Sequence, residues 1–296
     1  MEILDIKKEA SERLHVIHET TYSYSEAVKF SPHRLVMRPR EGHDVRLQSM
    51  TVETFPPSEI RWYRDILDNS IAVAEFHEKS SELRIRSEFI IGLPPAEPEE
   101  RPPVMVSYPP QIAGIDELAT MPYRQFTYPP EVDRLRTWFI ANGLSPVTGE
   151  KRAIFDELAA LIHQLVRYTR REEPGVQSPV STLDFGSGSC RDMAVLMIEV
   201  SRAMGYPARF VSGYLESSNS KVGRGSSHAW TEIYLPERGW TGYDPSIGHR
   251  IGPGHVAVGV SHHPRGVMPV TGGYSGPSGT TSSLKVAIST QRLPAA

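Results

Sequence analysis

The N-terminal part of the chain alternates short hydrophobic runs with turn residues. Between residues 14 and 93 the β-rich runs are "LHVIHETTYSY", "HRLVMRP", "RLQSMTVETF", "IRWYRDILDNSIAVAEF" and "SELRIRSEFIIGL". In "LRIR" at residues 83–86 apolar and charged positions alternate, as in a strand with one buried and one exposed face. The segment "LDNS" at residues 67–70 is typical of a hairpin turn. These patterns predict an antiparallel β-sandwich.

A proline-rich segment separates this part from a helical one. Residues 93–110, "LPPAEPEERPPVMVSYPP", lack periodicity, which is typical of a linker between packed units. Beyond it, "PEVDRLRTWFIANG" predicts a helix that ends at Gly143, and apolar residues recur at helical spacing in "EKRAIFDELAALIHQLVRYTRR". We therefore predict two domains: a β-rich domain with its linker over residues 1–110, and a second domain over residues 111–296.

A third helical pattern begins at the only cysteine of the chain. In "FGSGSCRDMAVLMIEV", residues 185–200, a Gly/Ser loop leads to Cys190, and an apolar stripe then continues to Gly205. Ser189 and Asp192 are spaced as in a capping box, with Asp where Glu or Gln is usual. The pattern predicts that Cys190 is the first residue of the helix. Unpaired N–H groups and the macrodipole favour a negative sulfur there, which suits a nucleophile.

Three β-like runs follow this helix: "ARFVSGYLE", "SHAWTEIYLP" and "GWTGYDP". The turn "PERG" joins the last two as an antiparallel pair, so the start of one strand and the end of the other lie at the same end of the sheet. His228 opens the first of this pair and Asp244 ends the second. We therefore predict that these side chains are close enough to hydrogen-bond. Near the C-terminus, "LKVAIST" predicts a last strand that returns to the sheet.

Cys190, His228 and Asp244 are the residue types that thiol catalysis requires. A nucleophilic cysteine needs a histidine as base or cationic partner and a third group that fixes the imidazole tautomer. Each residue alone has a simpler explanation, because a lone cysteine is most often a small buried hydrophobe and an Asp before Pro often begins a turn. The three residues in register favour catalysis. Asp192 is explained as a charge at the helix start and is left out of this set.

These motifs carry a family resemblance. The order "GSGSCRDMAVLMIEVSRAMGYPARFVSGYL", then "SHAWTEIYLPERGWTGYDP", resembles the core of the transglutaminase-like superfamily over roughly residues 150–270. Residues 14–93, notably "YSYSEAVKFSPHRLVMRPR", resemble the β-rich N-terminal domain of many bacterial members. The resemblance implies an α+β architecture: an N-terminal antiparallel β-sandwich, then a papain-like core in which the helix that carries the cysteine packs on an antiparallel sheet.

The same resemblance implies roles for individual residues. It makes Cys190 the nucleophile, His228 the base and Asp244 the orienting carboxylate, while Arg191 stands where many relatives have glutamine. The backbone N–H of Cys190 is the expected first oxyanion donor. In animal transglutaminases an aromatic N–H is the second donor, and Tyr168 is the nearest analogue in this chain.

The implied activity is cysteine-dependent chemistry on an amide through an acyl-enzyme. We expect hydrolysis of a peptide-type amide, in the manner of a cysteine protease, because water needs no second binding site. Protein-glutamine transamidation uses the same three residues and is the first alternative. A non-catalytic binding module on the same scaffold is the second alternative.

Composition restricts the partners. The chain has 296 residues, a formal net charge of -3, and Lys and Arg scattered among Asp and Glu, which argues against a nucleic-acid surface. One cysteine rules out an internal disulfide, and no apolar run reaches the roughly eighteen residues that cross a bilayer. We therefore expect a cytoplasmic protein with a peptide or other amide substrate and no membrane partner.

Neither a metal nor a cofactor is expected. His249, His255, His262 and His263 follow the last motif but lack the short regular spacing of a zinc site, so we expect them to be solvent-facing loop residues. The "GSGS" loop is not followed by Gly-Lys-Ser/Thr, which argues against a nucleotide site.

Overall fold

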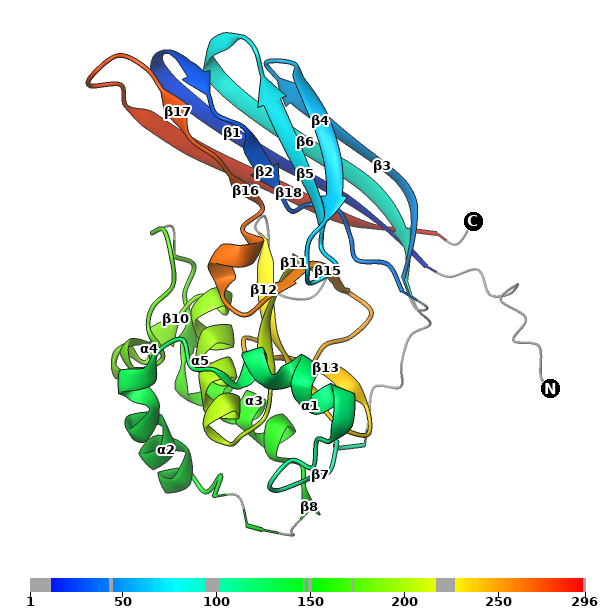
Figure 1. Cartoon of the computed structure of the whole chain (residues 1–296), viewed down its shortest axis with the longest axis vertical. Coiled ribbons are helices and arrows are strands. Elements are labelled where there is room, and N and C mark those ends of the chain that lie inside the picture. The colour runs from blue at the N-terminus through cyan, green and yellow to red at the C-terminus, as the bar shows by residue number, and fades with distance from the viewer. Residues whose placement is uncertain are drawn as a thin grey trace, which may run out of the picture.

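The computed structural model describes residues 12–42, 45–93, 102–145, 147–148, 151–171, 173–216 and 227–294. Figure 1 shows a layered β unit beside a mixed unit of helices and strands. Residues 94–101 of the predicted linker lie outside the described residues. In the part of the chain that the structure describes, no helix has the length and apolar character needed to cross a membrane.

The β unit consists of two antiparallel sheets. The first has the order β17–β1–β6–β3, with β18 also paired to β1, and its strands are β1 (Arg13–Phe30), β3 (Arg46–Phe55), β6 (Lys79–Gly92), β17 (Tyr274–Ser275) and β18 (Ser282–Leu293). The second has the order β16–β2–β5–β4, with strands β2 (His33–Leu35), β4 (Ser58–Arg64), β5 (Ser70–Phe76) and β16 (Val270–Thr271). Buried side chains from both sheets, including Phe30, Leu35 and Ile85, form one hydrophobic cluster.

The local patterns of this unit follow the sequence. Leu83 and Ile85 on β6 are fully buried whereas Arg84 between them is exposed, as the alternation predicts. The hairpin turn between β4 and β5 lies at the predicted position, and Asp68 within it has a positive φ of 61°. Aspartate tolerates this left-handed conformation better than most residues, which suits it to the turn.

The C-terminal end of the chain belongs to the N-terminal sheet. β18 pairs with β1 from Arg13 opposite Leu293 to Tyr24 opposite Ser282. The predicted division placed all of residues 111–296 in the second domain, whereas β16, β17 and β18 complete the β unit. The long strand β1 has β6 along one edge, and β18 satisfies the backbone groups along the other edge.

The mixed unit is built around a sheet of the order β14–β13–β12–β11–β15. Its strands are β11 (Ala208–Leu215), β12 (His228–Leu235), β13 (Gly239–Asp244), β14 (His249–Arg250) and β15 (His255–Ser261). Its helices are α1 (Gly114–Thr120), α2 (Val132–Ala141), α3 (Ile154–Leu165), α4 (Pro179–Phe185) and α5 (Cys190–Ala203). α5 packs on β12, where the Thr231 hydroxyl donates a 3.0 Å hydrogen bond to the carbonyl of Ala194.

Short elements complete the mixed unit. They are the 3-10 helices η1 (Met121–Arg124), η2 (Pro129–Glu131) and η3 (Pro264–Val267), and the two-residue strands β7 (Val106–Ser107), β8 (Lys151–Arg152), β9 (Arg167–Tyr168) and β10 (Ser187–Gly188). β7 pairs with β8, and β9 pairs with β10 in parallel.

The two units share a buried interface. Asn69, in the β4–β5 turn, forms two hydrogen bonds of 2.9 and 2.8 Å with the backbone of Val260 on β15. His18 on β1 hydrogen-bonds the hydroxyl of Tyr214 on β11 at 2.8 Å. The β unit therefore braces β11 and β15, two strands of the sheet that carries the candidate site.

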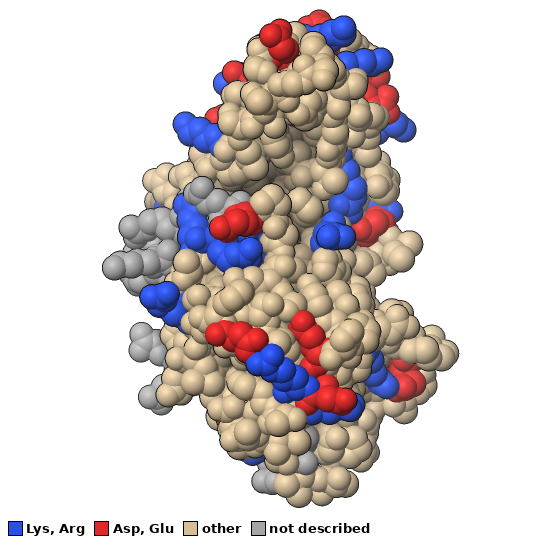
Figure 2. Space-filling model, turned by 90° about the vertical axis from the view of Figure 1, so that its left-hand side faces the viewer, with Lys and Arg blue, Asp and Glu red and all other residues tan. Residues whose placement is uncertain are grey.

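On the face in Figure 2, acidic and basic side chains are interspersed, as their scattered positions in the sequence predict.

Candidate active site

Cys190 is the first residue of α5, as the capping pattern predicts. Ser189 is the N-cap residue, and its pairing with Asp192 forms the capping box. Cys190 is buried, with 6% of its surface exposed, and it belongs to the cluster that joins α5 to the sheet. The thiol thus lies at the positive end of a 14-residue helix.

Glycine is required at two positions of the loop before Cys190. Gly186 ends α4 in the left-handed conformation, with φ of 56°, where an L side chain is strained. A Cβ on Gly188 would lie 2.9 Å from the Cβ of Asp192, which is closer than two carbons pack. The "GSGS" sequence therefore allows a tight approach of the loop to the start of α5.

Asp192 is a buried anchor of this loop. Its carboxylate accepts hydrogen bonds from the backbone N–H of Ser189 at 2.8 Å, from the backbone N–H of Gln177 at 2.7 Å and from the guanidinium of Arg171 at 2.8 Å. Burial opposes the charge of Asp192, but these donors outweigh it and lower the pKa of the carboxyl. Asp192 therefore connects three segments of chain around the thiol.

Replacement of Asp192 by alanine is expected to lower the free energy of unfolding by about 3 kcal/mol, because it leaves several donors in a buried site without an acceptor. Folding lowers the pKa of the Asp192 carboxyl. Its contribution to stability is therefore fully present above the ordinary pKa of 3.8 and is lost as the pH falls through the pKa in the folded protein. Urea denaturation at pH 7 measures the change. Asp133→Ala, which removes a 96% exposed carboxylate, is the control, and an equal effect of both substitutions would contradict the anchoring role.

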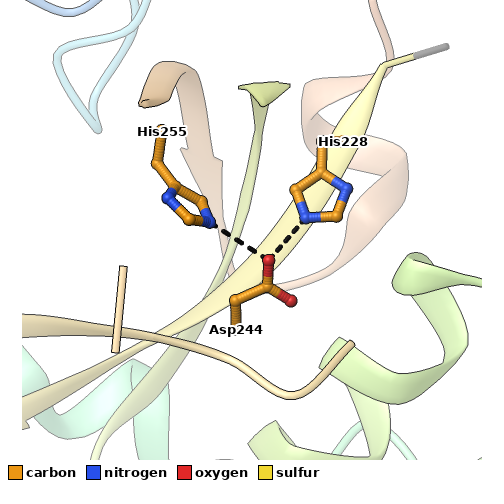
Figure 3. A group of neighbouring side chains, drawn as sticks. All are labelled: His228, Asp244 and His255. Carbon is orange, nitrogen blue, oxygen red and sulfur yellow. Dashed lines mark hydrogen bonds and ion pairs between the residues drawn. The ribbon is translucent and has the colours of Figure 1, made fainter. Parts of the chain in front are cut away.

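The structure brings His228 and Asp244 together at one end of the sheet. The turn between β12 and β13 pairs Leu235 with Gly239, and the hairpin runs back to Asp244 beside the start of β12. Nε2 of His228 donates a 2.6 Å hydrogen bond to Oδ2 of Asp244, and both side chains are fully buried (Figure 3). Oδ1 of Asp244 accepts from the backbone N–H of Ser246 at 2.9 Å and from its hydroxyl at 2.6 Å.

Cys190 acts on the same imidazole. Burial lowers the pKa of His228, but the charge of Asp244, the influence of the Cys190 side chain and the hydrogen bond with Asp244 raise that pKa to about 10. Nε2 of His228 is engaged by Asp244, so Nδ1 is the ring nitrogen available to the thiol. Nδ1 is buried and has no hydrogen-bond partner among the described residues. The imidazole of His228 is therefore paired with a carboxylate and is influenced by the thiol of Cys190.

One histidine of the C-terminal cluster was assigned wrongly from the sequence. His255 is the first residue of β15 rather than part of a solvent-facing loop, and its side chain is only 4% exposed. Its Nε2 lies 3.1 Å from Oδ2 of Asp244, the same oxygen that binds His228 (Figure 3). The run "HVAVGVS" is an alternating strand whose first residue lies at the His228 end of the sheet, and this is the signal that identifies it. Of the other three histidines, His249 is exposed, and His262 and His263 are partly buried.

The remaining predicted positions lie beside the thiol. Tyr168 on β9 pairs with Gly188 on β10, and its side chain packs against the cluster that contains Cys190. Its role as an oxyanion donor stays a prediction. Arg191 donates hydrogen bonds to the backbone carbonyls of Arg171 and Glu173 at 3.2 and 3.4 Å, so it supports the loop that Asp192 also anchors.

His228, Asp244 and His255 present three potential metal ligands within 4.8 Å of one another. Their hydrogen bonds do not fit a metal site. The backbone N–H of Gly252 donates to Nδ1 of His255 at 3.1 Å, so Nε2 of this ring carries the proton. A metal ligand needs a lone pair on that nitrogen. The contacts are those of a network of hydrogen bonds centred on Asp244.

Two family models match the chain. Residues 14–92 match the bacterial transglutaminase-like N-terminal region, and residues 140–245 match the transglutaminase-like superfamily. The second range contains Cys190, His228 and Asp244. The matches confirm the resemblance seen in the sequence.

Individual proteins resemble the chain to different extents. An uncharacterised protein of Mycobacterium leprae is 25% identical over 293 residues, which cover 93% of this chain and 98% of the relative. A protein-glutamine gamma-glutamyltransferase of Pseudomonas aeruginosa is 35% identical over 83 residues, which cover 26% of this chain and 12% of that protein. The solved structure of a candidate cysteine protease from Cytophaga hutchinsonii superposes with a TM-score of 0.71 at 16% identity, covering 96% of this chain and 91% of that one. This superposition confirms the predicted α+β fold.

Proposed function

We propose that the chain, which matches the models of the bacterial transglutaminase-like N-terminal region and of the transglutaminase-like superfamily, is a Cys-His-Asp thiol enzyme that hydrolyses peptide-type amide bonds. The observation that supports the proposal most strongly is the position of the His228 imidazole. It is buried and hydrogen-bonded to the carboxylate of Asp244, and both Asp244 and Cys190 raise its pKa. A scaffold that only binds a partner has no need of this arrangement.

The proposed reaction has two halves: formation of an acyl-enzyme on Cys190, and its breakdown by an incoming nucleophile. The Cys190 thiolate, paired with the His228 imidazolium, attacks the carbonyl carbon of the amide, and the electron pair of the carbonyl moves to oxygen. The backbone N–H of Cys190, at the start of α5, stabilises the resulting oxyanion. The imidazolium then donates its proton to the leaving amine as the C–N bond breaks, which leaves a thioester on Cys190. His228 next takes a proton from the incoming nucleophile, and the acid or new amide is released.

Asp244 acts through His228 in this scheme. It accepts a hydrogen bond from the Nε2–H group, which directs Nδ1 toward the thiol and stabilises the imidazolium. Water as the second nucleophile gives hydrolysis, whereas a primary amine gives transamidation. We favour hydrolysis because water needs no second binding site. Transamidation is the alternative, and a non-catalytic module is the second alternative.

An acyl-trapping experiment tests the proposal. The protein is mixed with a peptide library, quenched in acid and analysed by intact mass, with and without a primary amine. We expect a thioester adduct on Cys190 that decays to carboxylic acid products in both mixtures. Conversion of the adduct mainly to amide products in the presence of the amine would favour transamidation. No adduct with any peptide, together with an inert thiol, would favour the binding module.

A further inference from the structure

Two imidazoles share one carboxylate oxygen at the candidate site. Oδ2 of Asp244 is 2.6 Å from Nε2 of His228 and 3.1 Å from Nε2 of His255. Figure 3 shows the two rings reaching this oxygen from different strands. In the scheme above, Asp244 serves only His228, so the second ring has no assigned role.

The tautomer of His255 is fixed by its surroundings. The N–H of Gly252 occupies the lone pair of Nδ1, so the proton of the neutral ring is on Nε2 and points to Asp244. The ring of Trp230 packs against His255 in an edge-to-face arrangement, with centroids 5.3 Å apart. His255 is therefore held as a rigid donor.

The two rings differ in charge. Burial lowers the pKa of His255, and although the charge of Asp244 opposes this, the imidazolium of His228 lowers the pKa further. The ionisable groups that act around this oxygen are His228 on β12, Asp244 on β13, His255 on β15 and, through His228, Cys190 on α5. His255 thus donates as a neutral ring, while His228 carries the charge.

We propose that His255 is a positioning residue that holds Oδ2 of Asp244 toward His228 as a neutral hydrogen-bond donor. This role rests on the proposed function. Ser246 donates two hydrogen bonds to Oδ1 of Asp244. His255 donates one to Oδ2 and, as a neutral ring, adds no second positive charge beside the carboxylate. A charged donor in its place would compete with the imidazolium of His228 for the carboxylate and weaken their pairing. The neutral ring orients the carboxylate without forming an ion pair with it, so the negative charge of Asp244 remains paired with the imidazolium of His228.

Three substitutions of His255 separate positioning from packing. His255→Gln retains an amide N–H at about the distance of Nε2, His255→Asn shortens that amide so that it no longer reaches Asp244, and His255→Leu removes the donor. Loss of a hydrogen bond to a charged group is expected to lower kcat roughly ten- to hundredfold in His255→Leu and His255→Asn, with KM nearly unchanged. His255→Gln should stay within about fivefold of the wild type because it keeps the bond.

Alkylation of Cys190 by iodoacetamide gives a second readout that requires no substrate. The rate at pH 6.5, relative to that at pH 8.5, should fall in His255→Leu and His255→Asn and be restored in His255→Gln, since the imidazolium pairs less well with a displaced carboxylate. His18→Leu is the control, because His18 is also buried and hydrogen-bonded but lies on β1 and contacts Tyr214 and Thr20. It should lower stability and leave both readouts unchanged.

The outcomes distinguish this inference from the proposed function. The positioning role would be overturned if His255→Leu and His255→Asn match the wild type in turnover and in alkylation profile. In that case the turnover of the wild type would still support the proposed function. If the wild type turns over no amide, the alkylation ratios still decide the role of His255, and an inert wild-type thiol overturns both. If His255→Leu does not fold, the comparison of His255→Asn with His255→Gln decides, because both are polar and only one reaches Asp244.

Discussion

His228→Ala is expected to lower amide turnover by about a millionfold, the scale seen when a nucleophile loses its only base. The imidazole of His228 is hydrogen-bonded to the carboxylate of Asp244, and its pKa is raised by both Asp244 and Cys190. Without it, the proposed mechanism lacks the group that takes the proton of the thiol and protonates the leaving amine. The residual rate would come from the helix-start N–H groups and from substrate binding alone.

The same variant should change the pH dependence of thiol alkylation. The pKa of His228 is raised from 6.5 to about 10, so its charge is present at lower pH and is lost as the pH rises through that value. We therefore expect the wild-type rate to change little between pH 6.5 and 8.5. In His228→Ala the rate should rise roughly fiftyfold over this interval, as for a thiol without a cationic partner.

Rates of iodoacetamide labelling followed by intact mass measure this difference. His249→Ala, which removes an exposed imidazole on β14, is the matched control and should behave as the wild type. Identical profiles for the wild type and His228→Ala would remove the ion pair from the mechanism and leave the binding module as the better account.

The features that could be predicted from the sequence are those that depend on residues close together in the chain. Periodicity locates α3 and the alternation of β6, and the Ser189–Asp192 spacing locates the start of α5, because helix and strand patterns and caps are local. The meeting of His228 and Asp244 was also predictable, since a single hairpin with a short turn fixes the register of β12 and β13.

The features that the sequence did not reveal depend on distant pairings. β15 pairs with β11 and β18 pairs with β1, and neither partner follows from the run of residues itself. His255 was missed because its place beside Asp244 depends on the first of these pairings and on the segment from Gly252 that precedes it. The cytoplasmic setting, the oxyanion role of Tyr168 and the choice between water and amine stay predictions.

Asp244→Asn is expected to lower kcat by about ten thousandfold with little change in KM, because the imidazole loses both its fixed tautomer and the charge that stabilises its protonated form. Among the described residues, the groups that hydrogen-bond to the carboxylate of Asp244 all donate to it: His228, His255, and both the N–H and the hydroxyl of Ser246. A carboxylate accepts from all of them. An asparagine must turn its NH₂ group toward two of these donors, so the buried polar network is left mismatched.

The effect on His228 has a definite sign. With Asp244 ionised, the pKa of His228 is raised in spite of burial, and loss of that charge removes the largest contribution that opposes burial. The variant should therefore lose the imidazolium at neutral pH and show the steep alkylation profile expected of His228→Ala. Asp184→Asn, at an exposed carboxylate that pairs with Arg134, is the matched control. A carboxylate with a purely structural role would affect stability but leave the alkylation profile of the folded protein unchanged. A wild-type alkylation profile in Asp244→Asn would therefore exclude Asp244 from the proposed mechanism.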